Sequence, residues 1–186
     1  SFLFISVAVE DFGPLTLMFL RVFGAGMVLV LMATLTRKNQ PARQLPDVRG
    51  KWRAYLVIGL FNSALPFSLI AYSELRLTSS VASILNSTTP LFTALLAALW
   101  GSEALTGRKI GGVVMGMFGV AVLMGGSPLE VNAELILAVF ASLFAAFCYG
   151  VGTVYASKQI AGLPAIYAAI VQLLSASILL AIPAVL

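Results

Sequence analysis

The sequence predicts an all-α membrane protein, a polytopic bundle of about seven transmembrane helices. Apolar residues make up 60% of the chain and charged residues only 10%, and the mean hydropathy is +1.03. A soluble domain usually needs about 25% charged residues to cover its surface. The few charged residues stand in clusters between long uncharged runs, which is the spacing that a bilayer imposes. Helices are expected because open strands would leave backbone groups without hydrogen bonds in hydrocarbon.

Each predicted span is an apolar run, and most approach the roughly 20 residues that a helix needs to cross the hydrocarbon. In chain order the runs are 1–9, 15–36, 54–73, 80–101, 110–125, 134–156 and 164–186. The first run is short, the chain begins with Ser1, and the last run reaches Leu186. We therefore expect this chain to be a piece of a longer protein. No small-residue cleavage site follows the first run, so a signal peptide is not predicted.

The loops between these runs differ strongly in their basic residues. One set of loops carries Arg37, Lys38, Arg43, Arg49, Lys51, Arg53, Arg108, Lys109 and Lys158. The other set carries Arg76 alone, together with the acidic residues Glu10, Asp11, Glu74, Glu130 and Glu134. Because basic loops stay on the cytoplasmic side, we expect the N-terminal side of the protein in the cytoplasm. The basic pI of about 9.5 is then an orientation signal, and no nucleic-acid partner is predicted.

A weak internal repeat relates the first two spans to the last two. Pro14 introduces the second span and Pro164 introduces the seventh, 150 residues later, and Arg21 and Gln172 fall at similar depths, 151 residues apart. An odd number of helices separates the copies, so their topologies are inverted, as in many secondary transporters. We predict two inverted five-helix repeats, with the second truncated. The first repeat is 1–126, lacking the start of helix one, and 133–186 holds the first two helices of the second.

One stretch of the chain has the pattern of a known family. Residues 79–126 read SSVASILNSTTPLFTALLAALWGSEALTGRKIGGVVMGMFGVAVLMGG, with a proline in mid-helix, a Gly-x-Glu-x-Leu-Thr turn and a glycine-rich fifth helix. This order resembles the EamA family of the drug/metabolite transporter superfamily, and Pro14-Leu-Thr followed by Leu20-Arg21 is similar to the family's second helix. The resemblance covers essentially the whole chain, although the start of helix one and helices eight to ten are absent.

The resemblance implies a ten-helix, two-repeat carrier in a bacterial inner (plasma) membrane. It implies export of metabolites, amino acids or drug-like compounds, so the expected partners are a small-molecule substrate and the lipid bilayer. A homodimer is left open as an assembly, and no cofactor is expected.

Two prolines predict breaks in helical hydrogen bonding within the spans. Pro90 cannot donate to the carbonyl of Asn86, and Pro66 cannot donate to that of Asn62. A freed carbonyl beside an amide side chain is a polar spot suited to contact a substrate in a central cavity. The alternative is that a neighbouring hydroxyl, such as that of Thr89, binds the Asn86 carbonyl and the helix only bends. The residues alone leave both interpretations open.

Arg21 is a charged residue well inside a span, roughly 9 Å from its outer start at 1.5 Å per residue. It either faces the pathway and binds a carboxylate or phosphate of the substrate, or reaches back to the headgroups or to Glu10 and Asp11. Gln172 adds a polar group at similar repeat depth, and Tyr149 adds a ring able to stack on a substrate. The candidate pathway residues are Arg21, Asn62, Pro66, Asn86, Pro90, Tyr149 and Gln172.

Small residues that recur every three or four positions predict close helix packing, for example Gly112, Gly116 and Gly119 in the fifth span. No Asp or Glu lies near the middle of a predicted span, so the sequence offers no residue for proton coupling.

Three other classes of membrane protein fit less well than a transporter. The chain has no histidine and one cysteine, Cys148, which excludes a His/Cys metal cluster. Neither a His-Glu-x-x-His helix nor paired membrane aspartates are present to indicate an intramembrane enzyme, and no filter sequence or charged ring indicates a channel. A scaffold subunit should have purely small and apolar helix faces, whereas Asn62, Asn86 and Gln172 are polar. Transport is therefore the predicted function.

Overall fold

The computed structural model describes residues 14–36, 48–100, 106–125 and 132–185, and every regular element in these ranges is a helix. The first predicted span, 1–9, lies outside the described residues, as do Glu10 and Asp11. Each later predicted span is helical over most of its described residues. In chain order the elements are α2 (Pro14–Thr36), α3 (Val48–Gly59), the π-helix η2 (Leu60–Ala64), α4 (Leu65–Glu74), α5 (Ser79–Asn86), α6 (Thr89–Leu99), α7 (Gly107–Gly125), α8 (Ala133–Gln159) and α9 (Ala165–Val185).

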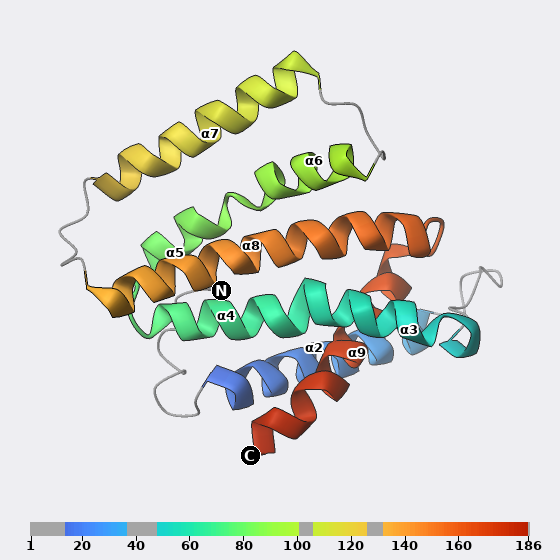
Figure 1. Ribbon diagram of the computed structural model, residues 1–186. Coiled ribbons are helices and arrows are strands. Elements are labelled where there is room, and N and C mark those ends of the chain that lie inside the picture. The colour runs from blue at the N-terminus through green and yellow to red at the C-terminus, as the bar shows by residue number, and fades with distance from the viewer. Residues whose placement is uncertain (1–13, 37–47, 101–105, 126–131, 186) are drawn as a thin grey trace.

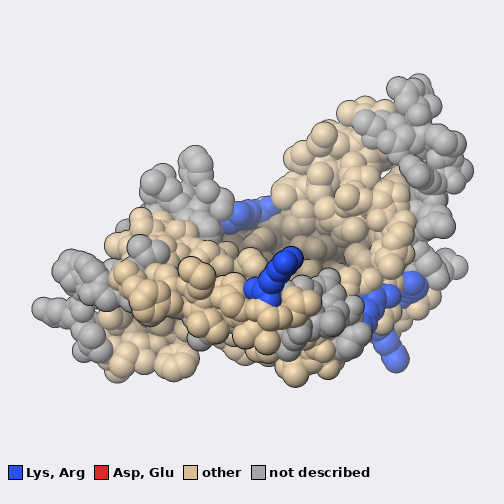
Figure 2. All heavy atoms as spheres, turned by 90° about the horizontal axis from the view of Figure 1, so that it is seen from above, with Lys and Arg blue, Asp and Glu red and all other residues tan. Residues whose placement is uncertain are grey.

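Length and apolar composition make several of these segments suited to cross a bilayer. Four segments qualify by themselves, namely Leu15–Leu35, Trp52–Glu74, Ser79–Leu99 and Ala133–Gln159, and α9 contributes the shorter apolar stretch Ala165–Ala181. Large apolar side chains such as Leu35, Met115 and Phe118 are 70% or more exposed. Figure 2 shows one face of the bundle, on which a few basic side chains are separated from one another and the rest of the described surface is uncharged. An exterior of this kind suits lipid, which confirms the prediction of an all-α membrane bundle.

Helix α8 lies at the centre of the bundle. It packs against α3, η2, α4, α5 and α6, whereas α9 packs against α2, α3 and η2. Helix α7 lies at the edge of the described part, beside α5 and α6, and α9 lies at the opposite side (Figure 1). The last two helices of the chain, α8 and α9, therefore pack directly against the helices that precede them.

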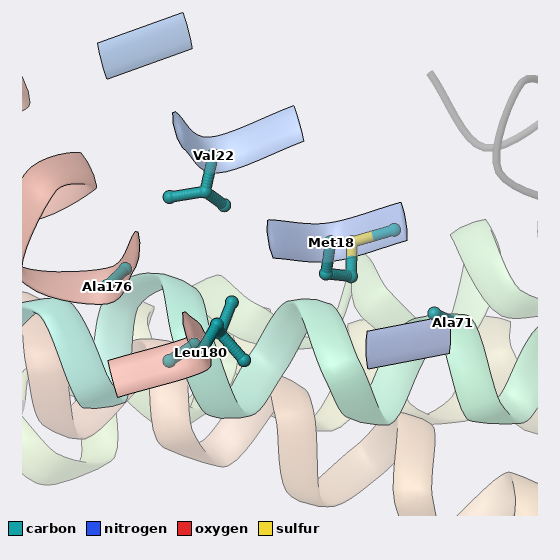
Figure 3. Packing of buried hydrophobic residues seen from close by; sticks show 6 residues of the cluster. Met18, Val22, Ala71, Ala176 and Leu180 are labelled. Carbon is teal, nitrogen blue, oxygen red and sulfur yellow. The ribbon is translucent and has the colours of Figure 1, made fainter. Parts of the chain in front are cut away.

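The apolar core between α2, α4 and α9 fixes how these three helices meet. Met18 and Val22 of α2 face Ala176 and Leu180 of α9, and Ala71 of α4 closes the cluster (Figure 3). One turn further along α2, a side chain at Gly26 would contact Leu174. Residue numbers rise along α2 as they fall along α9, so these two helices run antiparallel.

The glycines of α7 differ in the contacts they make within the described part of the chain. No atom of the rest of the described chain lies within 4 Å of where a Cβ on Gly112 or Gly119 would be, and only Gly116 approaches a neighbour, Leu91. The prediction of close packing holds instead at Gly59, which abuts the backbone of α9.

Two lysines join helix ends at one end of the bundle. Lys51 Nζ donates to the carbonyl oxygen of Gln159 at 2.8 Å, and Lys158 Nζ donates to that of Trp100 at 2.9 Å. Lysines suit this position because the last carbonyls of a helix are unpaired and carry partial negative charge. At the opposite end, Arg76 and Glu134 form an ion pair of 3.2 Å.

Replacing Lys158 with methionine is expected to lower the free energy of unfolding by about 1 kcal/mol, because one helix-capping hydrogen bond is lost. Thermal stability of the purified protein in detergent measures this effect. Arg108→Met, at the exposed start of α7, is the control that removes a cation without removing a described hydrogen bond. Equal stability of the two variants would contradict the capping role.

Candidate substrate pathway

The break predicted at Pro66 is present, and it takes the form of a π-helix. Pro66 is buried, and the turns before it, η2, are wider than an α-helix. The proline ring has no N–H for the carbonyl of Asn62 and crowds that carbonyl, so the turn opens. Gln172 of α9 binds polar groups of the opened turn. Its Nε2 atom donates to Ser63 Oγ at 3.0 Å and approaches the Asn62 carbonyl oxygen at 3.4 Å. The freed carbonyl is therefore bound from another helix.

The side chain of Asn62 is enclosed against α8. A Cβ on Gly152 would lie 2.8 Å from Asn62 Cγ, so the amide is seated on glycine backbone. Asn62 Oδ1 is buried and has no hydrogen-bond partner among the described residues. Buried acceptors are nearly always paired in proteins, so this oxygen marks a polar point that the described chain does not satisfy.

The second predicted break, at Asn86 and Pro90, is satisfied locally. Helix α5 ends at Asn86 and α6 begins at Thr89, and three successive hydroxyls bind the carbonyls between them. Ser87, Thr88 and Thr89 donate to the carbonyl oxygens of Ile84, Leu85 and Asn86 at 2.6, 2.6 and 2.7 Å. The alternative interpretation is thus the correct one for this carbonyl.

The side chains at this break differ in their surroundings. Pro90 is exposed, whereas Asn86 Oδ1 is buried and lacks a hydrogen-bond partner among the described residues. No described hydrogen bond joins Asn86 to Asn62 or Gln172. The two breaks are therefore separate polar points.

Arg21 is directed at the neighbouring helix α4. Its Cζ atom lies 5.1 Å from the ring centroid of Phe67, and the Phe67 ring meets that of Tyr149 edge-on at 6.2 Å. A guanidinium over an aromatic face is held by the ring quadrupole. Glu10 and Asp11, the alternative partners, lie outside the described residues. Phe67 lies four residues after Ser63, so the contacts of Arg21 and Gln172 are about one helical turn apart, on α4 and η2 respectively.

Three residues of this region were missed by the sequence predictions. Phe67 and Ser63 are the contacts of Arg21 and Gln172, and no local pattern distinguishes them from packing residues. Glu74 was assigned to a loop, which is wrong: it is the last residue of α4 and only 7% exposed. Its spacing of seven residues from Phe67 places it on the same helix face, and this periodicity was the available signal.

Comparison with known proteins identifies what the chain is similar to. A family model described as the EamA-like transporter family matches residues 1–125. The uncharacterized transporter YoaV of Bacillus subtilis (strain 168) is 24% identical over 153 residues, which cover 82% of this chain and 51% of the relative. The uncharacterized inner membrane transporter YedA of Escherichia coli (strain K12) is 29% identical over 162 residues, with 85% and 49% covered.

An archaeal relative has a similar identity and coverage. An uncharacterized transporter of Archaeoglobus fulgidus is 26% identical over 149 residues, which cover 80% of this chain and 50% of the relative. No solved structure gives a significant match. The chain spans about half the length of the curated relatives it matches.

Proposed function

This chain belongs to the EamA-like transporter family, and on that premise we propose that the full-length protein is a secondary transporter working by alternating access. It exports small molecules such as metabolites, amino acids or drug-like compounds across a bacterial inner membrane and has no enzymatic role. The basic end of the bundle, with Lys51 and Lys158, faces the cytoplasm, in keeping with the distribution of basic residues in membrane proteins.

The observation that carries this proposal is the interrupted helix at η2. π-Helical turns inside α-helices are frequent at functional sites, and transporters place substrate at discontinuous helices where two repeats meet. Here Gln172, from the segment assigned to the second repeat, binds the opened turn of the first at Ser63. Substrate polar groups compete for the same atoms, so binding can alter how the two segments are joined.

The arrangement of α2 and α9 supports two inverted repeats, 1–126 and 133–186. Arg21 and Gln172 each lie seven residues after the first residue of their helix, Pro14 and Ala165. Because α2 and α9 run antiparallel, these equivalent positions fall toward opposite ends of the bundle. Two-fold symmetry about an axis in the membrane plane requires this placement.

Replacing Gln172 with leucine is expected to lower substrate flux about tenfold, because a hydrogen bond to a buried polar group is worth about 1.4 kcal/mol. Flux is measured with the full-length protein in everted vesicles, against a panel of radiolabelled amino acids, sugars and cationic dyes. The matched control is Ser177→Ala on the same helix, whose hydroxyl bonds only its own helix at Leu174.

Two outcomes would contradict the proposal at different levels. Unchanged flux in Gln172→Leu would remove the Gln172 contact from the pathway while leaving transport intact. Absence of flux for every compound in the panel, with a folded protein, would favour a scaffold subunit instead.

A further inference from the structure

Glu74 is a buried acidic residue that the described chain leaves without a partner. It ends α4, is 7% exposed, and neither carboxylate oxygen has a hydrogen-bond partner among the described residues. Burying a charged group without compensation is strongly unfavourable. The carboxylate therefore needs a cation in this state, either a bound proton or a positively charged ligand.

Among the described residues, no charged group forms an ion pair with Glu74. Arg76, two residues along the chain, is bonded to Glu134 of α8. Arg21 of α2 rests its guanidinium on the Phe67 ring and forms no described ion pair with the carboxylate.

The helices packed against α4 offer few other titratable groups. They are α2, η2, α5 and α8, and η2 and α5 carry none. On α8 the remaining ones are Cys148, Tyr149, Tyr155 and, at the far end beside Trp100, Lys158.

We propose that Glu74 is the proton-binding group of the transport pathway, an inference that rests on the proposed function. One oxygen of the carboxylate takes up a proton from one side of the membrane and releases it to the other, so that a single O–H bond forms and breaks in each cycle.

The position of Arg21 explains how a conformational change drives this exchange. With Arg21 held on Phe67, burial without a described partner favours the neutral carboxyl of Glu74. When α2 moves relative to α4 during alternating access, the guanidinium can leave the ring and approach the carboxylate, which favours proton release. Arg21 and Glu74 lie on two helices that both contribute to the apolar cluster with Met18 and Ala71, so a small relative movement changes their separation.

Infrared difference spectroscopy on a pH step tests protonation of Glu74 without any substrate. The full-length wild-type protein is expected to show a carbonyl band of a protonated carboxyl group that disappears as pH rises. Glu74→Gln should lose this band and Glu74→Asp should shift it. Glu134→Gln removes an exposed carboxylate at the same end of the bundle and should retain the band. A band that is the same in wild type and both Glu74 variants would overturn the proposal.

Coupling is tested by imposing a pH gradient on everted vesicles and following compounds from the panel that the wild type transports. The gradient should accelerate flux in wild type and in Glu134→Gln, and the acceleration should be lost in Glu74→Gln. Retained acceleration in Glu74→Gln would overturn the inference while leaving transport intact. Loss of flux for organic cations alone, with gradient-driven flux of other compounds retained, would also overturn it and assign Glu74 to substrate binding. Absence of all flux in wild type would instead refute the proposed function.

Discussion

Gly59→Ala is expected to destabilise the bundle by about 1–3 kcal/mol, the usual cost of forcing an extra methyl group into a packed interior. A Cβ at this position would lie 2.7 Å from Ser175 Cβ, 2.8 Å from the backbone nitrogen of Ala176 and 3.0 Å from the backbone carbonyl oxygen of Gln172. Two of these atoms belong to the backbone of α9 and cannot rotate away. The helices must therefore move apart, which also withdraws Gln172 from Ser63.

Thermal unfolding in detergent, monitored by size-exclusion chromatography, measures this loss of stability. The matched control is Gly112→Ala, a change of the same chemistry at a site where a Cβ would meet no other described helix within 4 Å. Alanine is a better helix former than glycine by up to about 1 kcal/mol, so Gly112→Ala should be neutral or stabilising. Equal destabilisation by both substitutions would show that the contact between α3 and α9 is not tight at Gly59.

The helices were predictable because the apolar runs are long and the signal is cumulative along each run. The break at Pro66 was predictable for a different reason, since the missing N–H is a covalent property of proline. What the sequence could not give is the partner of the opened turn. Gln172 is 109 residues from Ser63, and their contact depends on how α9 crosses η2.

One local pattern left two interpretations open, and another was misread. The run Ser87-Thr88-Thr89 contains the hydroxyls that satisfy the carbonyls before Pro90, so the structure resolves an ambiguity that the residues left open. Glu74 was assigned to a loop because acidic residues usually mark the ends of spans. The seven-residue spacing from Phe67 places it on one helix face, but its burial depends on the helices packed against α4.

Arg21→Ala is expected to reduce flux of anionic or zwitterionic substrates by about ten- to a hundredfold, because a hydrogen bond to a charged group contributes about 1.5–3 kcal/mol. The guanidinium stands over Phe67 at 5.1 Å, and no described hydrogen bond occupies its N–H groups, which can meet a carboxylate or phosphate. Flux in everted vesicles measures the effect, with cationic dyes as the substrate class that should be affected least.

Arg53→Ala is the matched control. Arg53 also lies over an aromatic ring, that of Trp52 at 5.3 Å. Like Arg21 it is exposed, but it lies at the start of a span rather than within one. Loss of this second guanidinium should leave flux unchanged. A similar reduction in both variants would indicate a general effect of removing basic residues and would contradict a specific role for Arg21.

Arg21→Lys separates binding of substrate from anchoring at the membrane surface. A lysine stem can reach the headgroups as well as an arginine can, so anchoring alone predicts wild-type flux. A site that uses the planar, forked guanidinium to hold a carboxylate loses its paired hydrogen bonds with lysine. We therefore expect Arg21→Lys to fall between wild type and Arg21→Ala for anionic substrates. Full activity of Arg21→Lys would assign the residue to anchoring and leave Gln172 and the opened turn at η2 as the remaining polar contacts for substrate.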